Sequence, residues 1–387
     1  MRNLLTLFLL LVTGAAAMSQ NDFDSYMKEK NQAFADYSEK AAAGQKARQE
    51  EWESYHAASI ADYQSYMDAV AKEYEEYKKR VIAAWGKENF IEESAKEVVE
   101  YSDDLQTRMN IDFEAGTAEV AILAGLEEDV TEIAGKLKNA VVNFLETKLD
   151  IDVPPIFQNQ IDSKDYGLSG NSTPDELASK IIDDKESVTI DTDEGEKKLV
   201  KVRIELAEDH LSERAVIFKD IIRRYAGKFS MEEPLIYAVI EQESAFNPRA
   251  RSSAPAYGLM QLVPRYGGRE AFRHVYGKDF IPLPFYLYDP ENNIELGTGY
   301  LDKLMNVTFA NVRDQKSRML CAIAAYNTGP GNVCKTVSGS TSPSKAIPVV
   351  NSMSYDELFR LLRRKLPHSE TRNYIVQVTE KRKKYIR

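Results

Sequence analysis

The chain has 387 residues, which is long enough for two or three domains with a sizeable core. It carries 50 Lys and Arg against 61 Asp and Glu, a formal net charge of −11. Beyond the N-terminus, no apolar run approaches the roughly 18 residues that cross a bilayer, which excludes a multi-span membrane protein. The His residues lack metal-ligand spacing, so we expect no metal site and no cofactor. Cys321 and Cys334 could pair in an exported protein or remain buried free thiols, and their spacing leaves both open.

The charge is divided unevenly along the chain. Residues 206–387 hold 27 Lys and Arg against 19 Asp and Glu, whereas the first 205 residues hold 23 against 42. A basic domain suits an anionic substrate such as a nucleic acid, a lipid headgroup or a cell-wall polymer. Surface solubility is enough to explain the acidic half.

The N-terminus is typical of a secretory signal peptide, which we place at residues 1–19. One Arg precedes an apolar stretch from Leu4 to Val12, and Ala15 to Ala17 supply the small residues of a cleavage site. A retained single-helix anchor is the alternative, but the apolar stretch is short for a membrane span. No Cys stands directly after the signal, so we expect no lipid anchor and a location in the periplasm or cell envelope.

Residues 20–86 predict one long helix or a helical hairpin that turns near Gly44. The segment is rich in Ala, Glu, Lys and Gln and contains no Pro. Aromatic residues recur in pairs three apart, and successive pairs step by 11 or 18 residues, which places all of them on one helical stripe. The pairs are Phe23/Tyr26, Phe34/Tyr37, Trp52/Tyr55, Tyr63/Tyr66 and Tyr74/Tyr77. The stripe indicates an ordinary packed helix face, with self-association or a spacer to an envelope partner as alternatives.

Residues 87–205 predict a small α+β domain without recognisable chemistry of its own. Alternating apolar residues in 106–123, broken at Ala115-Gly116, indicate a first hairpin. A second hairpin, in 187–206, turns near Asp193 to Gly195. Between them lie an amphipathic helix with acidic residues in its first turn and a helix opened by Thr173 and Pro174.

Residues 206–387 predict an all-α domain, so the fold class is α+β and mainly α. One of its helices ends in the stretch EQESAFNP. Ile236 and Ile240 lead to Glu243 with helical spacing, so Glu243 continues the apolar face, whereas Glu241 points elsewhere. A carboxyl group on an apolar face loses solvation, which raises its pKa and suits a general acid. The spacing alone favours a partly buried structural Glu.

Four motifs in the same domain favour a catalytic role for Glu243 over a structural one. They are ESAFNP (243–248), YGLMQLVP (257–264), AAYNTGPGNV (324–333) and PHSETRNYIVQV (367–378). In order and spacing they resemble the catalytic domain of the lytic transglycosylases, of the soluble-transglycosylase and goose-lysozyme-like class, which implies a lysozyme-like fold. The segment YSDDLQTRMNIDFEAGTAEVAIL is similar, more loosely, to the N-terminal domain of the membrane-bound lytic murein transglycosylase C family.

The resemblance implies roles for particular residues. Glu243 matches the single catalytic acid and base of that family. Pro255-Ala256-Tyr257 and Val263 depart from the common pattern, which puts the shape of the subsites in doubt. The positions that match substrate-binding residues are Ser252, Met260, Gln261, Tyr326, Asn327 and Tyr374.

The resemblance also implies the reaction. The substrate would be the glycan strands of peptidoglycan rather than a nucleic acid. Glu243 would protonate the bond between N-acetylmuramic acid and N-acetylglucosamine, and would then deprotonate the 6-hydroxyl of the muramyl residue to leave a 1,6-anhydro end. Asp289 and Glu291 are candidates for a second carboxylate, but Asp289-Pro290 reads better as the start of a helix.

Two other functions remain open from the sequence. A lysozyme-like hydrolase would use water in place of the 6-hydroxyl. A wall-binding scaffold with a vestigial site would depend on the aromatic helix instead.

Overall fold

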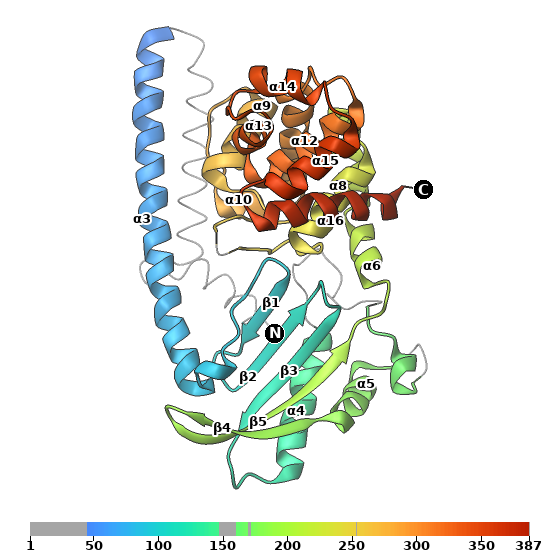
Figure 1. Ribbon diagram of the computed structural model, residues 1–387. Helices are drawn as coiled ribbons and strands as arrows, with labels where there is room; N and C mark the ends of the chain where they lie inside the picture. Colours follow the sequence, from blue (N-terminus) through green and yellow to red (C-terminus); the bar gives the residue numbers. More distant parts are fainter. Residues whose placement is uncertain (1–44, 147–159, 169–171, 253, 387) are drawn as a thin grey trace. The chain divides into compact units, whose positions relative to one another are not determined.

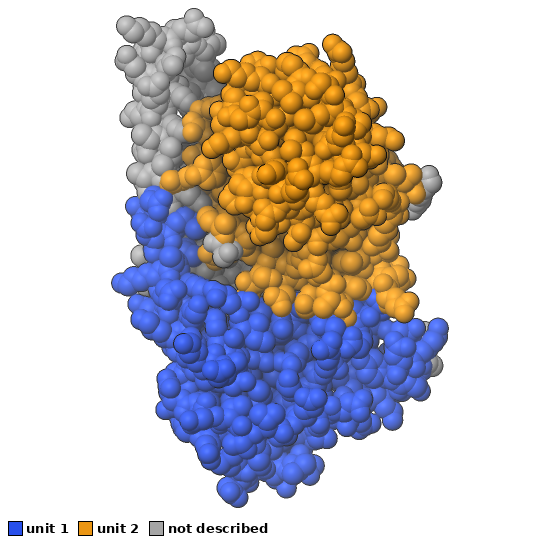
Figure 2. Space-filling model, in the orientation of Figure 1, with its two compact units in different colours: residues 1–92, 99–111, 117–207 blue, residues 93–98, 112–116, 208–387 orange. Residues whose placement is uncertain are grey.

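The computed structural model describes residues 45–146, 160–168, 172–252 and 254–386. It divides into two compact units (Figure 2). Unit 1 comprises Met1–Glu92, Val99–Ile111 and Thr117–Ala207, and unit 2 comprises Glu93–Val98, Asp112–Gly116 and Glu208–Arg387. Unit 2 therefore takes two short segments from the region before residue 206. The proposed signal peptide and the first two aromatic pairs lie outside the described residues.

Unit 1 is built on a five-stranded sheet of order β1-β2-β3-β5-β4 (Figure 1). The strands are β1 (Glu97–Tyr101), β2 (Thr107–Asp112), β3 (Thr117–Ala124), β4 (Glu186–Thr192) and β5 (Gly195–Glu205). β5 pairs antiparallel with both β3 and β4, with Val120 opposite Val202 and Asp191 opposite Glu196. The two predicted hairpins correspond to β2–β3 and β4–β5, and β1 is an additional strand that the sequence did not predict.

The predicted helices of unit 1 are also present. α4 (Val130–Leu145) begins at Asp129, whose side chain accepts from the backbone N–H groups of Thr131 and Glu132. α5 (Pro174–Ile181) begins with a capping box between Thr173 and Glu176. α4 packs on β3 with its apolar stripe, which consists of Ile133, Leu137, Ala140, Val141 and Phe144. The described residues of the unit also form the short 3₁₀ turns η1 (Lys87–Asn89), η2 (Ser163–Tyr166) and η3 (Ile182–Asp184).

The long helix α3 (Gln45–Trp85) is continuous within the described residues. Its last turn is part of the core of unit 1, because Val81, Ala84 and Trp85 pack against Tyr101 and other residues of the sheet. The Trp85 indole Nε1 donates to the Leu105 carbonyl at 2.8 Å, and its ring meets that of Tyr101 edge-on. The C-terminal end of α3 is therefore core structure of the sheet domain.

Unit 2 is helical throughout its part after residue 208, as predicted; the described residues there add only isolated bridges that join Tyr257 to Arg251 and Leu262. The helices are α6 (His210–Ile217), α7 (Lys219–Phe229), α8 (Glu233–Ser244), α9 (Arg269–Tyr276), α10 (Pro284–Tyr288), α11 (Pro290–Asp302), α12 (Gln315–Thr328), α13 (Pro330–Ser338), α14 (Pro343–Val350), α15 (Tyr355–Lys365) and α16 (Ser369–Tyr385), with π-helical turns η4 (Pro264–Gly268) and η5 (Lys303–Thr308). The mainly-α α+β fold class is confirmed.

α8 is the central helix of unit 2. Leu235, Ile236, Val239 and Ile240 have no exposed surface, and the helix packs against α16 and α7. One continuous apolar core surrounds it. A helix buried on most of its sides is rigid, and Glu243 lies in its last turn, so the backbone that carries this carboxyl group is held in place.

Cys321 on α12 and Cys334 on α13 are both buried and free in the structure, the second of the two alternatives for this pair. Burial raises the pKa of the Cys321 thiol to about 12, so this group is inert at neutral pH. Across the described part of the chain, no helix combines the length and the apolar character that a membrane span requires.

Candidate active site

A cavity of about 790 Å³ opens in unit 2 at the C-terminal end of α8. It collects side chains from α8, the loop after it, α11, α12 and α16, and also from the short segment that precedes β1. The residues that line it are Ala95, Lys96, Gln242, Glu243, Ser252, Ala254, Ala256, Gln261, Leu262, Val263, Tyr266, Gly267, Tyr300, Tyr326, Asn327, Thr328, Gly329, Glu370, Asn373, Tyr374 and Gln377.

Glu243 is the titratable group best suited to chemistry in this cavity. Desolvation raises the pKa of its carboxyl group to about 7, with a further increase from the charge of Glu370. The Tyr374 hydroxyl donates to Glu243 Oε1 at 2.6 Å, and this bond and the charge of Lys96 oppose the increase in pKa. A carboxyl with this pKa can give and take a proton near neutral pH.

The chain leaves Glu243 through a strained turn. Ala245 and Phe246 have φ values of 48° and 61°, in the left-handed region that non-glycine residues rarely adopt. The buried guanidinium of Arg214 stabilises this turn, because Nε donates to the Ala245 carbonyl at 3.1 Å and Nη2 to the Phe246 carbonyl at 2.9 Å. The Ser244 hydroxyl lies 2.8 Å from the Leu259 carbonyl, which ties the helix end to the next motif.

The loop of the second motif is held equally firmly. Gly258 has φ 75°, and a Cβ atom there would lie 2.1 Å from the Leu287 carbonyl oxygen, so only glycine fits. Gln261 donates from Nε2 to the carbonyls of Ala250 and Gly258, at 2.9 and 3.0 Å. Its Oε1 is buried and accepts no hydrogen bond from a described residue, while the side chain as a whole lines the cavity.

α12 and α16 supply the opposite part of the wall. The Tyr326 hydroxyl donates to the Met260 carbonyl at 2.8 Å. The amide of Asn327 is fixed at both ends, because Nδ2 donates to Glu370 Oε1 at 3.2 Å and Oδ1 accepts from the Thr371 hydroxyl at 2.6 Å. Asn327 therefore presents its amide group in one orientation.

Six of the seven residues expected from the sequence line this cavity, namely Glu243, Ser252, Gln261, Tyr326, Asn327 and Tyr374. Met260 does not. Its side chain is fully buried and packs against Gly297, where a Cβ atom would lie 2.3 Å from the sulfur. Only its backbone serves the site, as the acceptor for Tyr326. The Ser252 hydroxyl donates to the Ala254 carbonyl within its own loop.

Glu241 and Asp289 have structural roles. Glu241 does lie on a different face from Glu243, but it is buried rather than solvated, and its carboxylate pairs with Lys384 at 3.1 Å and accepts from Tyr385. Asp289 caps α11, with its side chain accepting from the Asn292 N–H at 2.8 Å. The interpretation of Asp289 as a helix cap is confirmed.

Two charged residues that line the cavity, Glu370 and Lys96, were not predicted from the sequence. Glu370 lies one helical turn before Tyr374, so the periodicity of the last motif could have found it. Lys96 comes from a stretch of ordinary composition, ESAKEV, about 150 residues before α8 in the chain. No local pattern could have indicated it.

Comparisons with known proteins agree with this geometry. Residues 220–347 match the family model described as the transglycosylase SLT domain, and residues 60–167 match the N-terminal domain of membrane-bound lytic murein transglycosylase C. Membrane-bound lytic murein transglycosylase C of Klebsiella pneumoniae is 31% identical over 318 residues, which cover 78% of this chain and 85% of that protein. The Yersinia pestis protein of that name is 32% identical, with coverage of 78% and 86%.

Among solved structures, the lytic transglycosylase Slt of Pseudomonas aeruginosa, as an inactive mutant, is 28% identical, with a TM-score of 0.34 and coverage of 42% of this chain and 23% of that one. The 70 kDa soluble lytic transglycosylase of Escherichia coli is 26% identical, with a TM-score of 0.33 and coverage of 45% and 25%.

A helical domain with one cavity-lining Glu at the end of its central helix, preceded in the sequence by a small α+β domain, defines the chain as a lytic transglycosylase. By identity and coverage, the chain belongs to the membrane-bound lytic murein transglycosylase C family.

Proposed function

We propose that this chain is a peptidoglycan lytic transglycosylase, which cleaves the β-1,4 bond between N-acetylmuramic acid and N-acetylglucosamine without consuming water. The observation that carries the proposal is the carboxyl group of Glu243, which lies in the cavity with a pKa near 7 and a hydrogen bond from Tyr374. The names of the relatives, which specify murein, support the same substrate.

The reaction needs one group that acts twice. Glu243 first donates its proton to the glycosidic oxygen, so that the N-acetylglucosamine side leaves as an alcohol while the muramyl acetamido oxygen stabilises the electron-poor C1. The Glu243 carboxylate then takes the proton of the muramyl 6-hydroxyl as O6 bonds to C1. The 1,6-anhydro ring closes, and Glu243 is again protonated for the next cycle.

The remaining residues position the sugar. The Gln261 side chain lines the cavity, with its Nε2 held by the Ala250 and Gly258 carbonyls, and the fixed amide of Asn327 is suited to the acetamido group. Tyr326 and Tyr374 are held by their own hydrogen bonds and shape the wall beside Glu243. Ser252 lies at the cavity margin. Because the intramolecular attack of O6 depends on geometry, such positioning accounts for much of the rate.

A lysozyme-like hydrolase is the second candidate, and Glu370 favours it. This residue lines the same cavity as Glu243 and is a second carboxylate, as hydrolytic glycosidases require. Its hydrogen bond from Asn327 supports a positioning role instead. Glu370→Gln distinguishes the two functions. In a lytic transglycosylase it removes a positioning contact, so anhydro products still form at a reduced rate. In a hydrolase it removes the base, so hydrated products are lost.

The test of the proposal is the variant Glu243→Gln, assayed on isolated sacculi. We expect turnover to fall by about 10²–10⁴-fold, the usual contribution of a general acid and base, while sedimentation with sacculi persists. Lysis at the rate of the unaltered protein would reject Glu243 as the acid. Binding without lysis by the unaltered protein would favour the wall-binding scaffold.

The location and partners follow from the substrate. We infer that the protein works in the periplasm or cell envelope on peptidoglycan strands, since its relatives are named as membrane-bound murein enzymes. The 20–86 segment is the part that would reach a further envelope partner or a second copy. Its C-terminal end belongs to the core of unit 1, so that end is not available for such contacts.

A further inference from the structure

The segment Glu93–Val98 belongs to the catalytic unit, although it lies far from the rest of that unit in the sequence. Two contacts hold it there. The Asn247 side chain, at the end of the ESAFNP motif, donates to the Ala95 carbonyl at 3.4 Å, and the backbone N–H of Phe113 donates to the Lys96 carbonyl at 2.9 Å. Both Ala95 and Lys96 line the cavity that contains Glu243.

The turn Asp112–Gly116 fixes this segment from the other side. The Asp112 carboxylate accepts from the backbone N–H groups of Glu114 and Ala115, at 2.9 and 2.8 Å. Gly116 has φ 70°, and a Cβ atom there would lie 2.7 Å from the ring of His210. The centre of the Phe113 ring lies 3.6 Å from the guanidinium carbon of Arg214, the residue that stabilises the turn after Glu243.

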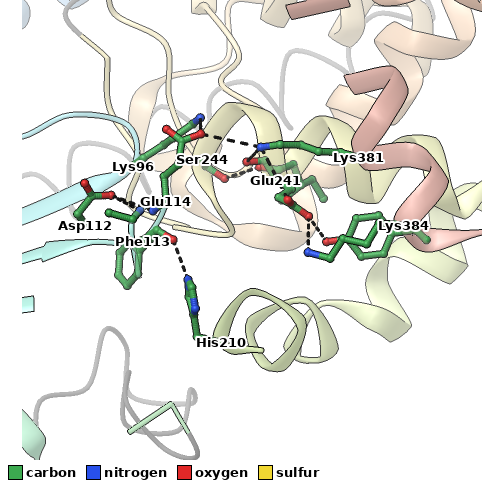
Figure 3. A network of polar contacts seen from close by, with 12 residues as sticks. Lys96, Asp112, Phe113, Glu114, His210, Glu241, Ser244, Lys381 and Lys384 are labelled. Atoms are coloured by element: carbon green, nitrogen blue, oxygen red, sulfur yellow. Dashed lines mark hydrogen bonds and ion pairs between the residues drawn. The ribbon is translucent and has the colours of Figure 1, made fainter. Parts of the chain in front are cut away.

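Lys96 is consequently a cation held at the cavity wall. Its side chain is 17% exposed and pairs with Glu114, whose carboxylate also lies 4.0 Å from Lys381. Figure 3 shows Glu114 between these two lysines. Lys381 in turn lies 3.8 Å from Glu241 and does not line the cavity. An ammonium group has three donors, and the pairing with Glu114 is its one hydrogen bond to a described side chain.

We propose that Lys96 binds a carboxylate on the lactyl and peptide arm of the muramyl residue, and that it thereby makes the cavity specific for muramyl over neutral sugars. This inference rests on the proposed function. The amide of Asn327 suits an acetamido group, which both sugars carry, whereas a cation recognises a carboxylate, which only the muramyl residue carries. Glu114 holds the Lys96 side chain in place and shares its charge with Lys381.

The test compares two ligands in a background that cannot turn over. Binding to Glu243→Gln is measured by calorimetry for a muramyl-containing oligosaccharide and for a neutral chitooligosaccharide of equal length. We expect Lys96→Met to weaken the muramyl ligand about tenfold or more, because a charge-assisted hydrogen bond is lost, and to leave the neutral ligand unchanged. Lys96→Arg keeps the charge and should retain most of the preference.

Lys383→Met is the matched control. It removes one positive charge from an exposed part of α16, where Lys383 pairs with Glu380 outside the cavity. Equal loss of both ligands in Lys96→Met would show a structural role, and equal effects of Lys96→Met and Lys383→Met would show a general charge effect. Either result overturns the inference.

A second readout uses catalysis. Glu243 is faced by Tyr374, Tyr326, Glu370 and Lys96, and Lys96 is the cation among them. Removal of that cation should move the alkaline limb of the pH–rate profile to higher pH in Lys96→Met and leave it unmoved in Lys383→Met. If the unaltered protein releases no anhydromuramyl product, the proposed function fails on its own, independently of these comparisons.

Discussion

At the scale of single residues, the protonation state of Glu243 decides when the site works. The surrounding protein excludes water from the carboxyl group and so penalises its charged form, which raises the pKa from 4.5 to about 7. The Tyr374 hydroxyl keeps the group oriented in either state, because the hydroxyl can donate to a carboxyl or to a carboxylate oxygen.

The first prediction concerns pH. A general acid must be protonated in the unbound enzyme, so kcat/KM should be level below about pH 6 and fall about tenfold per pH unit above pH 7. Turnover of a soluble muropeptide between pH 4 and 9 measures this profile. An alkaline limb near pH 4.5, the ordinary value for Glu, would mean that the site does not desolvate Glu243.

The same shift predicts an effect on stability. As the pH rises from 4.5 to 7, the unfolded chain ionises at Glu243 while the folded chain stays protonated, so the folded state loses stability and the full loss is present above pH 7. Glu243→Gln should therefore raise the free energy of unfolding by about 3 kcal/mol at pH 8 and leave it unchanged at pH 4. Urea unfolding at both pH values measures this difference.

The control for this measurement is Glu380→Gln, because Glu380 is an exposed carboxyl on α16. It should show little difference between the two pH values. A gain in Glu243→Gln that is the same at pH 4 and pH 8 would contradict the linkage.

At the scale of elements, α11 shows how a cap differs from a catalytic carboxylate. Asp289 accepts from the Asn292 N–H at the start of the helix and does not line the cavity. Asp289→Ala should lower the free energy of unfolding by about 1 kcal/mol, while Asp289→Asn, which can still cap, should cost less. Turnover of both variants should match the unaltered protein once they are folded. A loss of turnover without a loss of stability would make Asp289 a catalytic group.

The elements also differ in how far the sequence predicts them. α8 was predicted because a helical period, a Pro in the first turn and an Asn-Pro stop all agree over one short stretch. The role of Glu243 came from the resemblance of the four motifs, since the helical spacing alone favoured a structural Glu. β1 was missed because Glu97–Tyr101 follows a Glu- and Lys-rich stretch, and because its buried residues, Val98, Val99 and Tyr101, do not alternate strictly with exposed ones. Glu241 was assigned to the correct face, but its burial depends on Lys384 and Tyr385, which are more than 140 residues away.

At the scale of the whole molecule, the acidic front part and the basic catalytic part are less independent than their compositions indicate. Lys96 and Phe113 belong to unit 2 in space, although the chain passes through the sheet of unit 1 between them. No local period could show this, because the contacts join positions about 100 to 150 residues apart, as between Asn247 and Ala95.

The end of α3 leads to a prediction about truncation. Trp85 has no exposed surface and is hydrogen-bonded to Leu105, so removal of residues 20–85 should unfold unit 1, whereas removal of residues 20–66 should leave folding and turnover on purified wall unchanged. Trp85→Ala should cost about 3–5 kcal/mol. Thermal melting of the two truncated proteins and of Trp85→Ala, each compared with the unaltered protein, tests this. Equal stability of the two truncations would contradict a core role for the helix end.

The central claim is that one carboxylate suffices because the substrate supplies its own nucleophile. The most direct measurement is digestion of purified peptidoglycan in ¹⁸O-labelled water, with Glu243→Gln as the control and mass spectrometry of the released muropeptides. We predict 1,6-anhydromuramyl ends that carry no ¹⁸O, and release of these products from the variant that is slower by about 10²–10⁴-fold. Reducing ends that have incorporated ¹⁸O would contradict the claim and identify the enzyme as a hydrolase.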